Sequence, residues 1–273
     1  MEILRRDFLR GSTALALGSL LLEGRVSEAF CNVPTNLRLL PEIFKATVRL
    51  SSATYHNGAP VSNERSGTGF IYKYENGYCY VATNRHVAVN EEMERDMPFE
   101  HRTAIAEYGT PIPLELVAAD YKRDVAVLRT SYDLSDVTFE NYRSIIGKIE
   151  DCKRGDEVCF AGYGGKDFEF SKGSLYETDF HDTSDGMDHR DSIFVAPIFP
   201  GMSGSLLFRI VDQDIQWIGI VHAINKNKPL DQMRLSPHSF KVYSKVRQEC
   251  PTGRIFPGFA IQISDLEDVL LSA

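Results

Sequence analysis

The sequence predicts an all-β protein, either a sandwich or a pair of barrels, with a single helix at the end of the chain. Three observations support this fold class. Apolar and polar residues alternate in short runs, turn residues separate these runs, and only the last segment has helical spacing. Many short strands with one terminal helix favour an antiparallel architecture over a parallel sheet.

The expected strands follow one another closely along the chain. After a first strand at 43–50, a hairpin is expected in which 68–74 and 78–83 flank Glu75-Asn76-Gly77, because Asn-Gly is a strong hairpin-turn signal. Further strands are expected at 114–118, 124–130, 157–163, 193–196, 205–211 and 215–224. The helix is expected over 264–272, where Ser264 can cap it and Leu266, Val269 and Leu270 share one face.

The composition is that of a soluble globular protein. Hydrophobic residues make up 43% and charged residues 25% of the 273 residues, enough to bury a core as one large or two small domains. The net charge is −8, and basic residues cluster only at the N-terminus. This balance argues against a nucleic-acid-binding surface.

The first 29 residues resemble a bacterial export signal of the twin-arginine type. Arg5 and Arg6 precede an uncharged, mostly apolar run at 12–22, and Ser27-Glu28-Ala29 offers small residues for cleavage. The apolar run is too short to span a bilayer permanently. We therefore expect a signal peptide at 1–29, a periplasmic or secreted product, and no stable membrane insertion once it is processed.

No metal site or cofactor is expected. The five cysteines are odd in number and irregularly spaced, which fits neither a zinc site nor a dense disulfide framework. Cys152 and Cys159 could form a local bridge in an oxidising compartment, and the sequence leaves this open. The segment 181–191 is rich in histidine and aspartate, but its spacing matches no calcium loop or zinc pattern.

Three residues could carry hydrolytic chemistry. His86 follows the hairpin, Asp124 precedes the apolar run 125–128, and Ser203 lies in the glycine-rich turn "GMSGS". Each has an ordinary structural explanation when taken alone. Together they supply a nucleophile, a base and an acid that orients the base. Their order along the chain is that of chymotrypsin, and Ser205 stands where the G-x-S-x-G elbow of α/β-hydrolases requires glycine.

These segments resemble the trypsin-like (chymotrypsin-fold) serine peptidases, and most closely the HtrA-like protease domain without a PDZ domain. The resemblance covers about 40–272 and rests on "GTGFIY", "YVATNRHV", "RDVAVLR", "APIFPGMSGS", "IGIVHAI" and "GFAIQISDLEDVLLS". It implies a peptidase domain at 40–273, with two six-stranded antiparallel β-barrels at about 40–135 and about 145–262 and the C-terminal helix at 264–272.

The resemblance also implies an activity and its residues. The chain would be a serine endopeptidase in which His86 is the base, Asp124 orients it and Ser203 is the nucleophile. The N–H groups of Gly201 and Ser203 would form the oxyanion hole. The expected partner is a protein or peptide substrate. A catalytically silent peptide-binding protein of the same fold and an esterase are the alternatives.

The substrate pocket is placed by the same resemblance at Pro197, Ile198, His222 and Ala223. Pro197 and Ile198 bring neither acid nor base to it, which implies a preference for small or medium apolar side chains at P1, the substrate residue before the cut. His222 either tunes this preference or, in the favoured interpretation, is a hydrogen-bonded strand histidine beside Asp124.

Two features depart from the family pattern. Met202 stands where digestive trypsins carry the aspartate that pairs with a newly cut N-terminus, so activation by clipping is not expected. We expect Met202 to pack in the barrel interior instead. The segment 225–257 is longer than the corresponding HtrA-like loop and could cover the cleft.

Overall fold

The computed structural model describes the chain from residue 40 to residue 272, with internal gaps. The residues outside the described part are 1–39, 53–54, 57–58, 61–64, 90–101, 106–110, 134–146, 148, 165–166, 181–190, 197, 199, 213, 223–236, 250–255, 263–266 and 273. The expected signal peptide lies among them. No helix in the described part is both long and apolar enough to cross a membrane.

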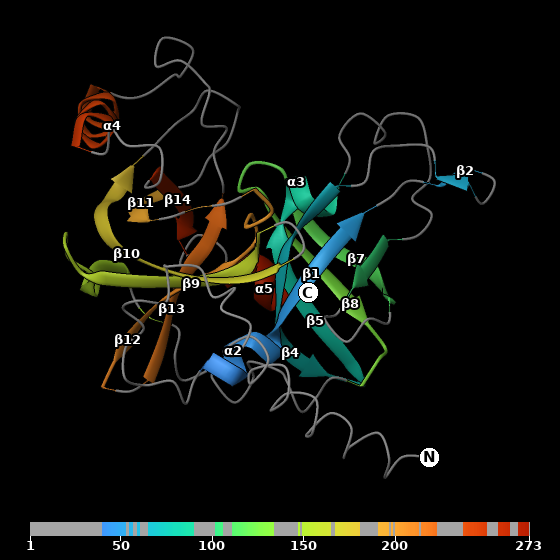
Figure 1. The fold of residues 1–273 in the computed structure, drawn as a ribbon. Coiled ribbons are helices and arrows are strands. Elements are labelled where there is room, and N and C mark those ends of the chain that lie inside the picture. The colour runs from blue at the N-terminus through green and yellow to red at the C-terminus, as the bar shows by residue number, and fades with distance from the viewer. Residues whose placement is uncertain are drawn as a thin grey trace.

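Two closed six-stranded antiparallel barrels make up the fold, so the predicted fold class is confirmed (Figure 1). The first has the strand order β1-β4-β5-β8-β7-β6 and the second β10-β11-β14-β13-β12-β9. The first comprises β1 (Thr47–Ser52), β4 (Arg65–Glu75), β5 (Tyr78–Asn84), β6 (Arg102–Ile105), β7 (Pro111–Asp120) and β8 (Val125–Thr130). The second comprises β9 (Glu157–Gly164), β10 (Asp167–Phe180), β11 (Asp191–Ala196), β12 (Leu206–Val211), β13 (Asp214–His222) and β14 (Phe256–Gln262).

Short elements surround the barrels. They are α2 (Leu40–Ala46), the ribbon of β2 (Tyr55–His56) and β3 (Ala59–Pro60), α3 (Arg85–Ala88), η4 (Ile149–Asp151), α4 (Pro237–Glu249) and α5 (Glu267–Ser272). The last helix returns to the first barrel, where the Tyr72 hydroxyl donates to the Leu270 carbonyl at 2.9 Å. Arg123 forms an ion pair with Asp268 in the same region. Helix α5 therefore packs against the first barrel, although it follows the last strand of the second.

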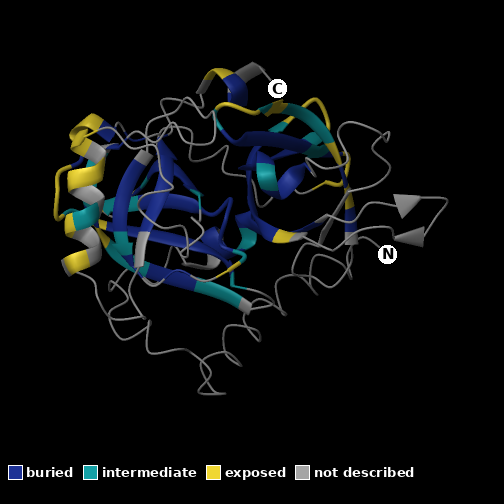
Figure 2. Ribbon diagram, turned by 90° about the horizontal axis from the view of Figure 1, so that it is seen from above, coloured by how far each residue is buried: buried dark blue, intermediate teal, exposed yellow. Residues whose placement is uncertain are grey.

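The barrels share a hydrophobic interface in addition to their own cores. Seen from above, they form two groups of buried strands side by side (Figure 2). One buried cluster joins Phe70 and Tyr80 of the first barrel to Phe208 and Trp217 of the second. Phe70 and Trp217 meet edge to face, with ring centroids 4.5 Å apart. This packing fixes the barrels against each other and so positions any site between them.

The predicted hairpin is confirmed, and its turn has the expected conformation. Asn76 and Gly77 both have positive φ, at 53° and 82°, as a two-residue turn with right-handed strand twist requires. The strand that follows carries Cys79, which is fully buried.

Some expected elements are wrong. The strand expected at 43–50 is a helix up to Ala46 and a strand only from Thr47. Ile43 and Ala46 are both buried, and their spacing of three residues is typical of one face of a helix. The apolar and polar residues of the same segment also fit a strand, so the sequence pattern was ambiguous. The last segment is not alone in being helical, because α2, α3 and α4 precede it. Strands β6, β10 and β14 and the β2–β3 ribbon were not predicted. The expected C-terminal helix is observed as α5, with 264–266 outside the described part.

Cys152 and Cys159 are buried and form no disulfide, so the local bridge left open by the sequence is not observed. Cys159 packs into the cluster between the barrels, whereas Cys152 packs into the core of the second barrel. Cys31 and Cys250 lie outside the described residues.

Candidate active site

Asp124 lies in the turn just before β8 and is held there by the last residue of β5 and the first residue of α3. Its carbonyl oxygen accepts the N–H of Arg85 at 3.0 Å and the side-chain amide of Asn84 at 3.2 Å. Its φ is +48°, in the left-handed region that aspartate tolerates better than most residues. These bonds fix Asp124, a strained residue, beside the start of α3. Its carboxylate faces His86, the residue after Arg85.

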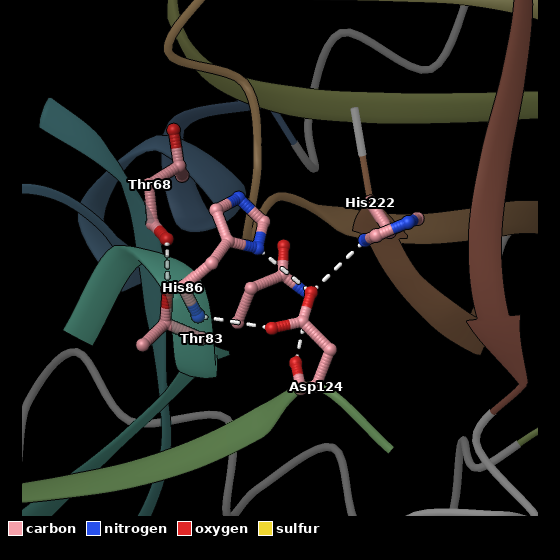
Figure 3. Close-up of polar contacts among 6 residues, drawn as sticks. Thr68, Thr83, His86, Asp124 and His222 are labelled. Carbon is pink, nitrogen blue, oxygen red and sulfur yellow. Dashed lines mark hydrogen bonds and ion pairs between the residues drawn. The ribbon is translucent and has the colours of Figure 1, made fainter. Parts of the chain in front are cut away.

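His86 contacts the Asp124 carboxylate through both its backbone and its ring. The backbone N–H donates to Oδ1 at 2.9 Å, and Nδ1 lies 2.7 Å from Oδ2 (Figure 3). Because an ionised carboxylate can only accept, the short ring contact places the proton on Nδ1 and leaves Nε2 as an acceptor. The Asp124 side chain is 4% exposed and that of His86 37% exposed, so the pair runs from the interior to an open edge.

Burial acts against ionisation of Asp124, but hydrogen bonds outweigh it. Desolvation by itself would raise the pKa of this carboxyl, while the ring N–H groups of His222 and His86 lower it. The net effect holds the pKa of Asp124 well below its ordinary value of 3.8, so the group is an anion at neutral pH.

His222, at the end of β13, is the second imidazole on this carboxylate. Its Nδ1 lies 2.9 Å from the same Oδ2 that His86 contacts, and the two rings stand edge to face with centroids 5.8 Å apart (Figure 3). The favoured interpretation of His222, a hydrogen-bonded strand histidine beside Asp124, agrees with this contact.

Ser203 lies in a turn of the second barrel that is bonded directly to the first. The N–H of Thr68 in β4 donates to the Ser203 carbonyl at 2.8 Å, and the Thr68 hydroxyl donates to the Gly201 carbonyl at 3.0 Å. Within the second barrel, the Gly204 N–H donates to the Val221 carbonyl at 2.8 Å. Ser203 itself is 9% exposed. The turn therefore has a fixed place beside the strand that pairs with β5, which leads to His86.

The glycines of this turn adopt a conformation that other residues resist. Gly201 and Gly204 have φ of 97° and 89°. A Cβ on Gly204 would lie 1.9 Å from the Thr68 carbonyl oxygen and 2.4 Å from the Thr83 hydroxyl. The bonds that hold the turn use the N–H groups of Gly204 and Ser205, and those of Gly201 and Ser203 take no part in them.

The pocket residues are described only in part. Ile198 is buried among the core residues of the second barrel, and its Cδ1 would lie 2.2 Å from a Cβ on Gly258. Pro197 and Ala223 lie outside the described residues. Met202 is fully buried in the same core, so the prediction that it packs in the barrel interior is confirmed.

The sequence did not reveal the network of polar residues around Thr68, which lies at the junction of the two barrels. The Thr83 hydroxyl donates to the Thr68 carbonyl at 2.6 Å, and the Thr68 hydroxyl also accepts the Tyr163 N–H at 2.8 Å. Thr68 stands in "SGTGF" and Thr83 in "ATNRH", inside the quoted motifs. No signal in the sequence pairs them, because their partners are mostly backbone atoms from distant segments.

His86, Asp124 and His222 together could hold a metal ion, since one ligand atom from each lies within 4.8 Å of the others. The observed distances between the ring nitrogens and the carboxylate oxygen are those of hydrogen bonds rather than of ligands around a shared metal ion. The ring nitrogens stand 2.7 and 2.9 Å from Oδ2, whereas ligands around a tetrahedral ion with bonds of about 2.0 Å lie roughly 3.3 Å apart. The three side chains therefore have the geometry of a hydrogen-bonded network.

Comparison with known proteins identifies the class that this fold and site define. Residues 67–220 match the family model of the trypsin-like peptidase domain. The chain belongs to this family.

A curated relative lies in the HtrA group. The serine protease Do-like HtrA of Bacillus subtilis (strain 168) is 29% identical over 191 residues, which are 63% of this chain and 39% of the relative. The chain therefore spans well under half the length of that relative.

Solved structures of peptidases share the fold. The Rv3671c protease of M. tuberculosis in its active form is similar with a TM-score of 0.58 and 18% identity, over 85% of this chain and 82% of that one. The HtrA-type protease AlgW with a tripeptide gives 0.60 and 20%, over 88% of this chain and 63% of that one. Similarity at this level of identity establishes the fold alone.

Proposed function

We propose that this chain is a serine endopeptidase that works through His86, Asp124 and Ser203. The observation that carries the proposal is the double contact of His86 with the buried Asp124 carboxylate, at 2.9 and 2.7 Å, beside a serine turn bonded across the barrel interface. A base whose tautomer is fixed by a buried anion suits the activation of a hydroxyl group.

The reaction follows from the protonation states that the contacts impose. With the Nδ1 proton held by Asp124, His86 Nε2 takes the proton of Ser203 as Oγ attacks the scissile carbonyl. His86 then gives this proton to the leaving amine, and an acyl-enzyme remains. Water, deprotonated by the same nitrogen, cleaves the acyl-enzyme and restores the serine. Asp124 stays ionised throughout and stabilises the imidazolium.

Gly201 and Ser203 supply the oxyanion hole in this proposal. Their N–H groups are free of the hydrogen bonds that hold the turn, and the positive φ of Gly201 sets the direction of the first. Two backbone donors aimed at the developing oxyanion would stabilise the transition state more than the substrate.

The substrate is a peptide bond in a protein or peptide, preferably after a small or medium apolar residue. Related HtrA-type structures carry a tripeptide and a decapeptide. Ile198 supports the preference, because it is apolar and packs tightly over Gly258 next to Phe194. An apolar side chain at this position offers no charge to bind a long ionic side chain.

The same proposal includes export through the twin-arginine route to the periplasm or beyond. It rests on Arg5, Arg6 and the short apolar run that follows. Replacing both arginines by lysine should leave the protein in the cytoplasm with residues 1–29 attached, as immunoblots of cell fractions would show. Unchanged export of that variant would refute this route.

Labelling of the purified chain with a fluorophosphonate probe tests the activity. Wild type should be labelled, Ser203→Ala should not, and His86→Ala should be labelled slowly. Ser174→Ala is the matched control, because Ser174 is an exposed serine on β10. If neither wild type nor the control reacts, the chain is a silent peptide-binding protein and the proposal fails.

Substrate profiling separates the peptidase from an esterase. A peptide library should be cut by the wild type, with apolar residues enriched before the cut. An enzyme that hydrolyses simple esters and leaves every peptide intact would be an esterase of the same fold.

A further inference from the structure

The carboxylate of Asp124 accepts three N–H groups from only two residues. Oδ1 accepts the His86 backbone N–H at 2.9 Å, and Oδ2 accepts the ring N–H groups of His86 and His222 at 2.7 and 2.9 Å (Figure 3). The proposed Ser203–His86–Asp124 mechanism uses only the two bonds from His86. The third bond comes from His222, which lies on the other barrel.

We propose that His222 is a positioning residue, which holds the Asp124 carboxylate in the orientation that His86 needs. This inference rests on the proposed function and extends it to a fourth side chain. His222 acts through Asp124 and touches no reacting atom.

The geometry supports this role in two ways. Oδ2 stands between the two rings, so the His222 N–H opposes rotation of the carboxylate away from His86. His222 also lies one residue beyond Val221, whose carbonyl and N–H bond to Gly204 and Ser205 beside the nucleophile. One short stretch of β13 therefore holds both the acid and the serine turn.

The energetic balance points the same way. A carboxylate that is 4% exposed loses most of its hydration and needs several donors to remain an anion. The hydrogen bonds from His222 and His86 both lower the pKa of Asp124, against the desolvation that raises it. The His222 side chain is itself 15% exposed, so its bond is little weakened by competing water.

The test compares three replacements of His222 in the purified chain. Asparagine carries its amide nitrogen near the position of Nδ1, glutamine places it near Nε2, and leucine removes the donor. We expect His222→Leu and His222→Gln to lose about ten- to hundredfold in kcat with little change in KM, because the lost hydrogen bond is made to the Asp124 carboxylate rather than to the substrate. His222→Asn should recover most of the rate.

Proton NMR supplies a readout that needs no catalysis. Imidazole N–H protons held against a carboxylate exchange slowly and resonate far downfield. Wild type should show two such signals, His222→Asn one and Asp124→Ala none, while His238→Ala, which changes an exposed histidine on α4, should keep both.

The outcomes separate this inference from the proposed function. A wild type that resists the fluorophosphonate would refute the peptidase, while the two NMR signals would still show both rings bonded to Asp124. If His222→Leu had the same kcat as wild type, or if wild type showed only one downfield signal, the positioning role of His222 would be refuted. Neither result would contradict the proposed peptidase activity.

Discussion

The N–H of Thr68 donates to the carbonyl oxygen of Ser203 at 2.8 Å, and this bond joins β4 of the first barrel to the serine turn of the second. The Thr68 hydroxyl adds two further links, to the Gly201 carbonyl at 3.0 Å and from the Tyr163 N–H at 2.8 Å. Because His86 and Ser203 lie on different barrels, their relative position depends on such links.

Thr68→Val should impair catalysis through this junction. The change keeps the shape and removes the hydroxyl, so the Gly201 carbonyl and the Tyr163 N–H each lose their bond to Thr68. We expect a loss of about 1–3 kcal/mol in the free energy of unfolding and at least about tenfold slower probe labelling. Urea unfolding and labelling rates measure both. Thr47→Val is the control, since its buried hydroxyl donates to the Ile43 carbonyl and not to the serine turn, and it should lower stability alone. Equal labelling of the two variants would contradict the role of Thr68.

Gly204→Ala should be far more damaging than Gly77→Ala. Both glycines have positive φ, at 89° and 82°. A Cβ at Gly204 would overlap the Thr68 carbonyl, whereas a Cβ at Gly77 meets nothing within 4 Å. We expect about 1 kcal/mol of destabilisation at Gly77 and roughly 3 kcal/mol or more at Gly204, with labelling lost only in the latter. Similar melting temperatures for the two variants would show that the serine turn has room to move.

Asp124 should make the folded state sensitive to acid. Its pKa is lowered on folding, so the native state binds fewer protons than the unfolded state in acid. The resulting stability is complete above the ordinary value of 3.8 and is lost as the pH falls below it towards the folded pKa. Asp124→Asn removes this contribution, so its unfolding free energy should fall less than that of wild type between pH 6 and 3 by urea titration. Parallel curves would refute the assignment.

Cys152 and Cys159 should be unreactive thiols in the native protein. Burial raises the pKa of both, that of Cys159 to about 12, so almost no thiolate is present at neutral pH. Mass spectrometry after N-ethylmaleimide treatment should show neither residue modified in the native protein and both modified in denaturant without reductant. A requirement for reductant would instead reveal a disulfide.

Much of the site could be predicted because its residues lie in short, recognisable segments. The motifs predict that His86 and Asp124 act together, and the structure puts His86 Nδ1 2.7 Å from Asp124 Oδ2. The packing of Met202 followed from its apolar character. These features depend on local chemistry, which a sequence displays.

Other features depend on contacts that no local pattern encodes. The bonds of Thr68 join distant segments, and the alternation of β10 is broken at its centre by the polar run Ser171-Lys172-Gly173-Ser174. Helix α4 lies within 225–257, for which the resemblance to HtrA-like domains implies only a long loop. His222 had two interpretations, and only the fold could show that its ring reaches Asp124.

The most direct test of the central claim is to map the residue that forms the covalent adduct. The purified chain is treated with a fluorophosphonate, digested, and analysed by tandem mass spectrometry. The account predicts a single phosphonylated residue, Ser203, with the adduct absent after Ser203→Ala and its formation slowed in Asp124→Asn. An adduct on any other residue, or one that survives Ser203→Ala, would contradict the assignment of Ser203 as the nucleophile.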